Sequence, residues 1–460
     1  MGTATETHTH GLVKFGVFYE IQLPFPHREG DETRCFREAL EHVELADRLG
    51  FDYMWGVEHH FLDDHALSSA PEVWLAAAAA RTRRIRIGHG IACMPPGFMH
   101  PAHIAERIAT LDQVSGGRVE FGTGESSSRM ELEGYGVDNA TKREAYLEAV
   151  EQVCNMMVMT PYPGYDGRFF TMPCRNVVPK PVQKPHPPVW VAGKPDLAAQ
   201  LGVGCLGFNV VGGKQAKILV DQYYRTLESC VPIGHAVNAN IAVLATMHCH
   251  RDAEVARRNG ENLRFFGYSI GKYYLNGSVQ PGRGNSWEEF LAVKGELPDM
   301  GDSPTSAIGT PAMIREHLRA LRVAGVDQVL LLHQAGQLDH DANCRSLELF
   351  AREIMPEFVE DEDRREDGAD EQAPRDQDPE VHRDERVQGE DGAEAENAED
   401  DADHELALAH AASGRRGQLP RRDRGDHVPL PDGEDRLEGE LGVRGLGECP
   451  GLRPGRARPR

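Results

Sequence analysis

Short apolar runs alternate with segments of helical periodicity along most of the chain. A run such as 51–57 is apolar almost without interruption, which is typical of a strand buried on both faces. A segment such as 101–114 repeats apolar residues every three or four positions, which is typical of a helix with one buried face. The pattern predicts eight strands, at 13–19, 51–57, 85–90, 118–122, 188–192, 205–211, 240–247 and 328–333. It also predicts helices at 36–49, 71–81, 101–114, 142–159, 216–230, 253–266, 311–323 and 343–354.

Eight successive strand–helix units predict an α/β fold, a (β/α)₈ TIM barrel with insertions. We expect the barrel to span residues 14–358, after a flexible N-terminus at 1–13. One insertion, 267–306, is rich in Gly, Pro and Asn and includes Tyr273 and Tyr274. Long irregular segments of this kind serve as lids or binding loops. The sequence leaves two interpretations open, a lid over the barrel mouth and an interface arm.

The composition changes after the barrel. Residues 359–460 contain no Phe, Trp or Tyr, and 30 acidic against 16 basic residues give −14 of the overall charge of −23. A segment so poor in large apolar side chains cannot offset the entropy of ordering its backbone. We therefore expect a disordered, acidic, low-complexity tail. It is either an interaction arm or a carboxyl end translated in a shifted reading frame.

The block Glu58-His59-His60-Phe61 follows the predicted strand 51–57. Side chains at the carboxyl ends of barrel strands line the active-site mouth. A carboxylate and two imidazoles at that place suggest proton chemistry or metal ligation. Adjacent residues of an extended segment point to opposite sides, which disfavours one metal ion held by both histidines. Either both histidines are functional, or only His59 faces the pocket and His60 is a core residue.

Other sequence features mainly exclude classes of function. The nine cysteines lack paired spacing and are expected to be reduced thiols without a zinc signature. His248-Cys249-His250 resembles a set of metal ligands. The side chains of adjacent residues point in different directions, however, and we expect no metal ion there. The part before the tail carries about −9, by difference between −23 and −14, which argues against a nucleic-acid partner. Because no secretory signal or membrane-length apolar run is seen, we expect a cytoplasmic protein with no membrane partner.

Five segments in order carry a family resemblance: 14–18 (KFGVF), 45–52 (LADRLGFD), 58–61 (EHHF), 100–101 (HP) and 111–122 (LDQVSGGRVEFG). Together they resemble the bacterial luciferase-like family of flavin-dependent monooxygenases, over about Lys14 to Phe358. The resemblance implies a barrel that binds reduced FMN, supplied by a separate flavin reductase, and activates O2. Some relatives use a deazaflavin instead, and family members commonly pair as homodimers.

Individual positions take their expected roles from this resemblance. His59 matches the family's active-site histidine, which is thought to act as a base beside the flavin, and Glu58 is expected to fix its tautomer. Gly90 and Ile91 match a place where relatives carry a non-proline cis peptide against the flavin ring. Gly124 opens the loop after the fourth strand, where luciferase has an arginine that meets the FMN phosphate.

That arginine position is Glu125 here. A carboxylate facing a phosphate would be repelled, so Glu125 cannot take over the role of the arginine. The donors expected to replace it are backbone amides and the side chains of Ser126, Ser127, Ser128 and Arg129. Alternatively, the serines only cap a helix.

A second phosphate contact is expected after the fifth strand, at Ala192, Gly193 and Lys194. Backbone N–H groups at a helix start suit an anion. The loop is shorter than in relatives, and Lys194 is expected to compensate for its length.

We therefore expect an FMN-dependent monooxygenase that oxidises a small hydrophobic organic substrate, with His59 as its base. The alternatives are a deazaflavin-dependent hydride-transfer enzyme and a non-catalytic flavin-binding barrel. The expected apolar lining of the mouth is Phe18, Met94, Phe98, Met99 and Phe208.

Overall fold

The computed structural model describes residues 13–207, 212–276, 285–296 and 306–359. Eight parallel strands close into a barrel in the order β9-β11-β1-β2-β3-β4-β7-β8, and β8 pairs back onto β9. The predicted (β/α)₈ barrel is thus confirmed. The barrel strands are β1 (Lys14–Tyr19), β2 (Tyr53–Gly56), β3 (Arg86–Cys93), β4 (Val119–Gly124), β7 (Val189–Ala192), β8 (Gly204–Gly207), β9 (Ile241–Cys249) and β11 (Gln328–Gln334).

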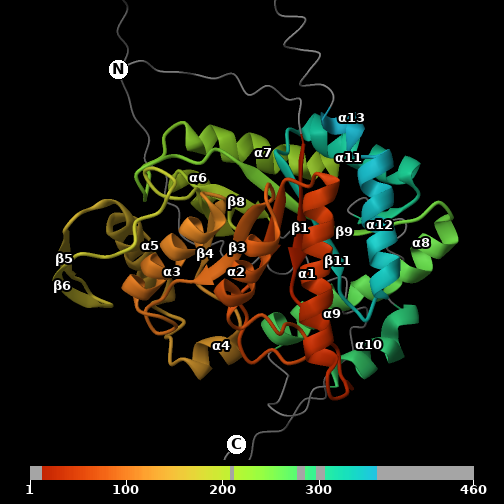
Figure 1. Cartoon of the computed structure of the whole chain (residues 1–460), viewed down its shortest axis with the longest axis horizontal. Coiled ribbons are helices and arrows are strands. Elements are labelled where there is room, and N and C mark those ends of the chain that lie inside the picture. The colour runs from red at the N-terminus through yellow and green to blue at the C-terminus, as the bar shows by residue number, and fades with distance from the viewer. Residues whose placement is uncertain (1–12, 208–211, 277–284, 297–305, 360–460) are drawn as a thin grey trace, which may run out of the picture. The chain divides into compact units, whose positions relative to one another are not determined.

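Helices follow the strands and surround the barrel (Figure 1). Several begin with proline at the first helical position, where the missing N–H needs no partner. The principal α-helices are α1 (Asp31–Leu49), α2 (Pro71–Arg81), α3 (Pro101–Ser115), α5 (Lys142–Val158), α6 (Pro195–Gln200), α7 (Gly213–Leu227), α8 (Ala253–Gly260), α11 (Pro311–Ala324) and α12 (His340–Glu353). The other α-helices are α4 (Arg129–Gly134), α9 (Phe265–Ile270), α10 (Ser286–Val293) and α13 (Pro356–Val359).

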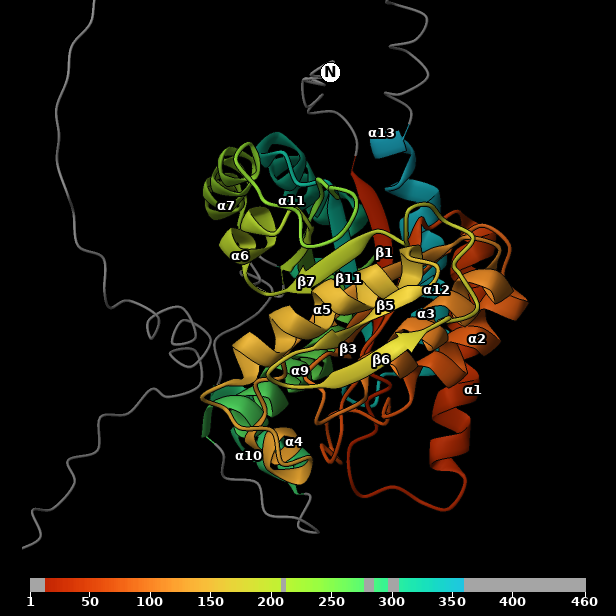
Figure 2. The same ribbon diagram turned by 90° about the vertical axis from the view of Figure 1, so that its left-hand side faces the viewer.

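Two strand pairings were not expected from the sequence. β5 (Tyr162–Asp166) and β6 (Thr171–Arg175) form an antiparallel hairpin beside α5 (Figure 2). β10 (Ser306–Gly309) pairs in parallel with the carboxyl end of β9. Both lie outside the barrel closure, so they extend the fold without changing it.

The barrel wall separates two hydrophobic cores. Alternate residues of a strand point to opposite faces, and Leu330 of β11 packs inward while Val329 packs outward against helices. The inner core contains Trp55, which meets Trp190 edge-on across the barrel with ring centroids 5.4 Å apart. Gly88 leaves room for this ring, because a Cβ at that position would lie 2.3 Å from Trp55. The lower barrel is therefore packed, which leaves the carboxyl ends of the strands for chemistry.

The insertion is partly helical in its described part. It contains α9, the π-helix η2 (Gly271–Asn276), α10 and the 3-10 helix η3 (Lys294–Glu296). Trp287 and Phe290 of α10 pack on Phe265 of α9 in a separate apolar cluster. Within the described ranges, no helix is long and apolar enough to cross a membrane. The expectations for the tail, for Phe208 and for residues 1–12 fall outside the described residues.

Candidate active site

His59 lies just after β2, at the carboxyl end of the barrel strands, and is surrounded by acidic and phenolic groups. Its Nδ1 atom is 3.1 Å from Oε1 of Glu131, and its Nε2 atom is 3.5 Å from Oε2 of Glu20. The Tyr274 hydroxyl lies 3.0 Å from Nδ1. Glu20 follows β1, Glu131 belongs to α4 and Tyr274 to η2. Three separate elements, one from the insertion, thus converge on one imidazole.

Hydrogen bonds hold Glu131 in place. One carboxylate oxygen accepts from the Ser126 hydroxyl at 2.5 Å, and the other accepts from the backbone N–H of His60 at 2.9 Å. The side chain of Glu131 is 1% exposed, so few alternative partners from solvent are available to it. The carboxylate expected beside His59 is therefore Glu131 and not Glu58.

His65 continues the cluster. Its Nε2 atom is 3.6 Å from Oε2 of Glu20, and its Nδ1 atom is 2.7 Å from the Ser269 hydroxyl. Neither Oε2 of Glu20 nor Nε2 of His65 makes a hydrogen bond of normal geometry, although both residues are buried. One ligand atom each from Glu20, His59 and His65 lie within 4.8 Å of one another, a spacing that a metal ion also accepts. Proton chemistry at His59, without a metal ion, stays a prediction from the sequence.

The charges in this cluster shift its pKa values. Burial alone would lower the pKa of His59, but the carboxylates of Glu20 and Glu131 outweigh it and raise the pKa to about 9. Burial raises the pKa of Glu20 to about 7, against the opposing effect of His59. Burial would also raise the pKa of Glu131, yet His59 and its hydrogen bonds hold that pKa below its usual value. The neighbouring carboxylates thus favour the protonated form of His59, with Glu131 as the carboxylate nearest to its Nδ1 atom.

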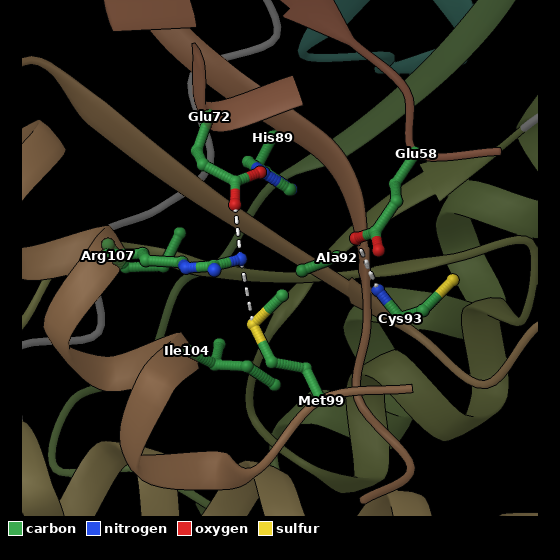
Figure 3. A pocket seen from close by; sticks show the side chains of 9 residues that line it. Glu58, Glu72, His89, Ala92, Cys93, Met99, Ile104 and Arg107 are labelled. Atoms are coloured by element: carbon green, nitrogen blue, oxygen red, sulfur yellow. Dashed lines mark hydrogen bonds and ion pairs between the residues drawn. The ribbon is translucent and has the colours of Figure 1, made fainter. Parts of the chain in front are cut away.

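Glu58 and His60 pair with each other. His60 Nε2 is 2.9 Å from Oε1 of Glu58, and Oε2 of Glu58 accepts from the backbone N–H of Cys93. Figure 3 shows Glu58 turned toward Cys93 in a pocket that α2 and α3 also line. The expectation that Glu58 fixes the tautomer of His59 is corrected, because neighbours on extended chain diverge. The Nδ1 atom of His60 also lies 3.1 Å from the hydroxyl of Tyr135, so both of its ring nitrogens have partners within the protein, and a functional role for His60 stays a prediction.

Aromatic rings gather around His60. Phe98 and Tyr135 lie with ring centroids 5.1 Å apart, and Phe61 lies 5.3 Å from Tyr135 and is 53% exposed. Of the expected apolar lining, Met99 lines the pocket of Figure 3, whereas Phe18 is buried in the inner core and Met94 in the outer core.

A cationic group surrounds Glu125 after β4. Arg143 of α5 binds both carboxylate oxygens of Glu125, at 2.7 and 2.8 Å, and Lys194 lies 3.3 Å away. Lys142 donates to the backbone oxygen of Ser126 at 2.7 Å. Burial would raise the pKa of Glu125, but Arg143, Lys194 and Lys142 lower it. Three cations and one carboxylate thus gather at the place where the family resemblance implies a phosphate.

The other expected phosphate contacts are less favourable. Arg129 is 63% exposed and pairs with Glu133, four residues along α4. The backbone N–H of Gly193 donates to Leu206 of the neighbouring strand, so it is engaged within the protein. α6 starts at Pro195 and has six residues, which makes a weak anion site. Among these residues, only Lys194 joins the group around Glu125.

The loop after β4 and the middle of β3 lie against each other. The bond between Gly90 and Ile91 is cis, as expected at this position. Ile91 packs on Gly124, where a Cβ would lie 2.5 Å from its terminal methyl group. In the loop, Ser127 is exposed, while Ser128 is fully buried and its hydroxyl lacks a hydrogen bond of normal geometry.

Sequence reasoning missed four residues of the site: Glu20, Glu131, Tyr274 and Arg143. Glu20 directly follows a barrel strand, and that position was a usable signal. Arg143 had the appearance of an ordinary charged position on a helix. Glu131 lies 72 residues from His59 and Tyr274 lies 215 residues away, and no spacing rule connects them.

Comparison with protein families agrees with this geometry. Residues 13–328 match the luciferase-like monooxygenase family. Limonene 1,2-monooxygenase of Rhodococcus erythropolis is 26% identical over 362 residues, covering 76% of this chain and 88% of the relative. The oxygenase component of the flavin-dependent trigonelline monooxygenase of Acinetobacter baylyi is 26% identical over 348 residues, covering 72% and 91%.

Relatives with other cofactors and a solved structure complete the comparison. The F420-dependent glucose-6-phosphate dehydrogenase of Amycolatopsis mediterranei is 27% identical over 337 residues, covering 70% of this chain and 94% of the relative. The crystal structure of monooxygenase RslO1 from Streptomyces bottropensis has a TM-score of 0.63 at 25% identity, covering 75% of this chain and all of that one. This chain belongs to the luciferase-like monooxygenase family of oxidoreductases.

Proposed function

We propose that this protein is the oxygenase component of a two-component monooxygenase that uses reduced FMN and O2 on a small hydrophobic substrate. The observation that carries the proposal is the convergence of Glu20, Glu131 and Tyr274 on His59, at the mouth of a luciferase-like barrel. Proton-transfer groups in a mouth of this kind are where the family fold places its chemistry.

The chain offers groups that fit a flavin phosphate. Arg143, Lys194 and Lys142 outnumber Glu125, and the Ser128 hydroxyl nearby is buried without a normal hydrogen bond. Arg143 would bind the phosphate most strongly, because a guanidinium makes charge-assisted, paired hydrogen bonds. Bound reduced FMN would supply the electrons that activate dioxygen. Ile91 and Gly124 are the proposed neighbours of its ring.

The role of His59 in this proposal differs from the base expected at first. A raised pKa of about 9 makes His59 an imidazolium near neutral pH, so it is suited to hold and donate a proton. Glu131 orients its Nδ1 side, and Glu20 faces its Nε2 side. With a pKa of about 7, Glu20 is suited to return the proton between turnovers. Tyr274 closes the site from the insertion, which supports a lid in preference to an interface arm.

The aromatic group around His60 supports the proposed substrate class. Phe61, Phe98 and Tyr135 present ring faces and edges, and Phe61 is half exposed. Such a surface favours a hydrophobic ring or chain over a sugar phosphate. The named relatives include one monooxygenase of limonene and one of trigonelline, both small ring compounds. The separate reductase, the homodimer and the cytoplasmic location stay predictions.

The test is anaerobic binding followed by oxygen chemistry. Purified protein is titrated with reduced FMN, reduced riboflavin and reduced F420, and O2 is then admitted with a panel of cyclic terpenes, aromatic amines and long-chain aldehydes. We expect tightest binding of reduced FMN, and transfer of one atom of labelled oxygen from O2 to a panel compound. Tight binding of F420 with hydride transfer and no oxygen incorporation would replace this proposal by the F420-dependent alternative.

A further inference from the structure

A second cluster of potential ligands lies outside the barrel, where α1 packs beside α12 (Figure 1). His42 belongs to α1, and His340 and Cys344 belong to α12. One ring nitrogen of each histidine and the sulfur of Cys344 lie within 4.8 Å of one another. The barrel wall separates this cluster from the proposed flavin site, because Tyr19 and Val17 of β1 face the outer core.

We propose that His42, His340 and Cys344 form a binding site for Zn²⁺ or another divalent cation that prefers nitrogen and sulfur ligands. Zinc bonds of about 2.0–2.1 Å to nitrogen and about 2.3 Å to sulfur place two ligands of a tetrahedral ion roughly 3.5 Å apart. The distance between Nε2 of His340 and Sγ of Cys344 is 3.7 Å. Residues four apart on a helix share one face, so α12 presents this pair together.

The buried polar groups around the cluster support a ligand there. His42 is 1% exposed, and neither of its ring nitrogens makes a hydrogen bond of normal geometry. The same holds for both nitrogens of fully buried His333, whose ring lies 5.3 Å from that of His42, and for the hydroxyl of Tyr19 beside it. Buried polar groups are rarely left without partners. A cation would engage His42 directly and provide ordered water for its neighbours.

Charge and access also suit a cation. Oε2 of Glu41 lies 3.3 Å from Nε2 of His340, and the Glu41 side chain is 45% exposed. It therefore places a negative charge at the solvent side of the site, where an ion would enter. Imidazole and thiol ligands select zinc and related metals over magnesium or calcium, which prefer oxygen. The rings of His42 and His340 stack with centroids 4.7 Å apart, so binding requires one ring to turn.

An ion at this site would bind where the first and the last parts of the barrel meet. α1 is the first barrel helix and α12 the last, and β1 pairs with β11 beneath them. An ion held by both helices would join the two ends of the barrel and would stabilise the folded state by mass action. The proposed function does not depend on this site.

The experiment uses full-length, tag-free protein freed of metal by a chelator and then titrated with Co²⁺. Cobalt bound by a thiolate gives a near-ultraviolet charge-transfer band, and Zn²⁺ should displace it. We expect the band in the wild type and in Cys174→Ser, which removes an exposed cysteine, and its loss in Cys344→Ser. The Glu20–His59–His65 cluster contains no sulfur, so an ion bound there cannot produce the band.

Thermal unfolding supplies an independent readout. Zn²⁺ should raise the melting temperature of the wild type and of Cys174→Ser, and it should raise that of Cys344→Ser and His340→Asn much less. His340 is replaced in preference to His42. Because His340 is half buried and His42 is deeply buried, replacing His340 disturbs the core less. A Co²⁺ spectrum without a thiolate band, or a band that survives in Cys344→Ser, would overturn the proposal. An equal response of all variants to Zn²⁺ would do the same.

Discussion

Glu131 lies 3.1 Å from Nδ1 of His59 although 72 residues separate the two in the chain. The same carboxylate accepts from the Ser126 hydroxyl, and the backbone oxygen of Ser126 accepts from Lys142. Ser126 thus connects the proposed proton site with the cations around Glu125. Its backbone has φ of +59°, a conformation that costs energy for a residue other than glycine and is commonly kept at functional sites.

Replacing Glu131 by Gln should lower turnover by about 10²-fold, at the low end of what general acid–base catalysis contributes. The amide keeps the shape of the side chain but removes the counter-ion of His59. Flavin affinity should change little. The matched control is Glu58→Gln, which alters a carboxylate that faces His60 and Cys93. Single-turnover rates and reduced-flavin titrations measure both effects, and a larger rate loss in Glu58→Gln would show that the wrong carboxylate has been assigned.

The shifted pKa of His59 predicts a pH dependence of stability. The folded value of about 9 lies above the ordinary 6.5, so folding takes up a proton between these pH values. The contribution of His59 is fully present below pH 6.5 and is lost as pH rises through 9. Its upper limit is on the order of 3 kcal/mol, from the size of the shift.

The measurement compares the flavin-free wild type with His59→Gln by denaturant unfolding across this range. The difference in unfolding free energy should be largest at the acid end and should shrink toward alkaline pH. His103→Gln, at an exposed position on α3, is the control for replacing a histidine by glutamine. A gap between wild type and His59→Gln that widens with pH would contradict the assigned direction of the shift.

The barrel was readable from the sequence because its strands are buried on both faces. All eight predicted strands are present, and the predicted bounds differ from the observed ones by a few residues at the strand ends. The hairpin β5–β6 was not predicted because Pro163, Gly164 and Pro173 interrupt its strand pattern. Such residues are tolerated in strands only outside a continuous sheet. β10 escaped because its four residues give no periodicity and depend on pairing with β9.

The site was only partly readable. His59 was found because the end of a barrel strand is an informative position. Glu58 was predicted to be the partner of His59 because the two residues are adjacent in the sequence, whereas the partner in the structure is Glu131. Glu131 and Tyr274 reach the site through helices packed by long-range contacts, which no local pattern encodes. The sequence alone shows that Glu125 stands where the family has an arginine. The pairing of Arg143 with Glu125 could not be predicted, because it depends on how α5 lies against β4.

Close packing of two barrel strands predicts a stability effect at Gly122. A Cβ there would lie 2.0 Å from the backbone oxygen of His89, and backbone cannot move aside cheaply. Gly122→Ala should therefore lower the free energy of unfolding by about 1–3 kcal/mol or more, as overpacked cores do. Gly267→Ala is the control, because nothing lies within 4 Å of its added methyl group and its helix should gain slightly. Equal unfolding midpoints for the two variants would contradict the assigned contact.

The cations around Glu125 predict which flavin the barrel selects. Arg143→Ala should weaken binding of reduced FMN by about tenfold or more, since charge-assisted contacts contribute roughly 1.5–3 kcal/mol. Binding of reduced riboflavin, which lacks the phosphate, should change little. Lys194→Ala should have the same selectivity with a smaller effect, because Lys194 is half exposed and more than 3 Å from Glu125.

Arg129→Ala is the matched control for this series. Arg129 is exposed and pairs with Glu133, so its removal should leave the affinity for both flavins unchanged. Anaerobic fluorescence titrations at one fixed ionic strength measure all three variants, because screening by salt would otherwise blur the comparison. A parallel loss of FMN and riboflavin affinity in Arg143→Ala would mean that Arg143 supports the fold of the loop after β4. The phosphate would then have to be bound elsewhere in the mouth.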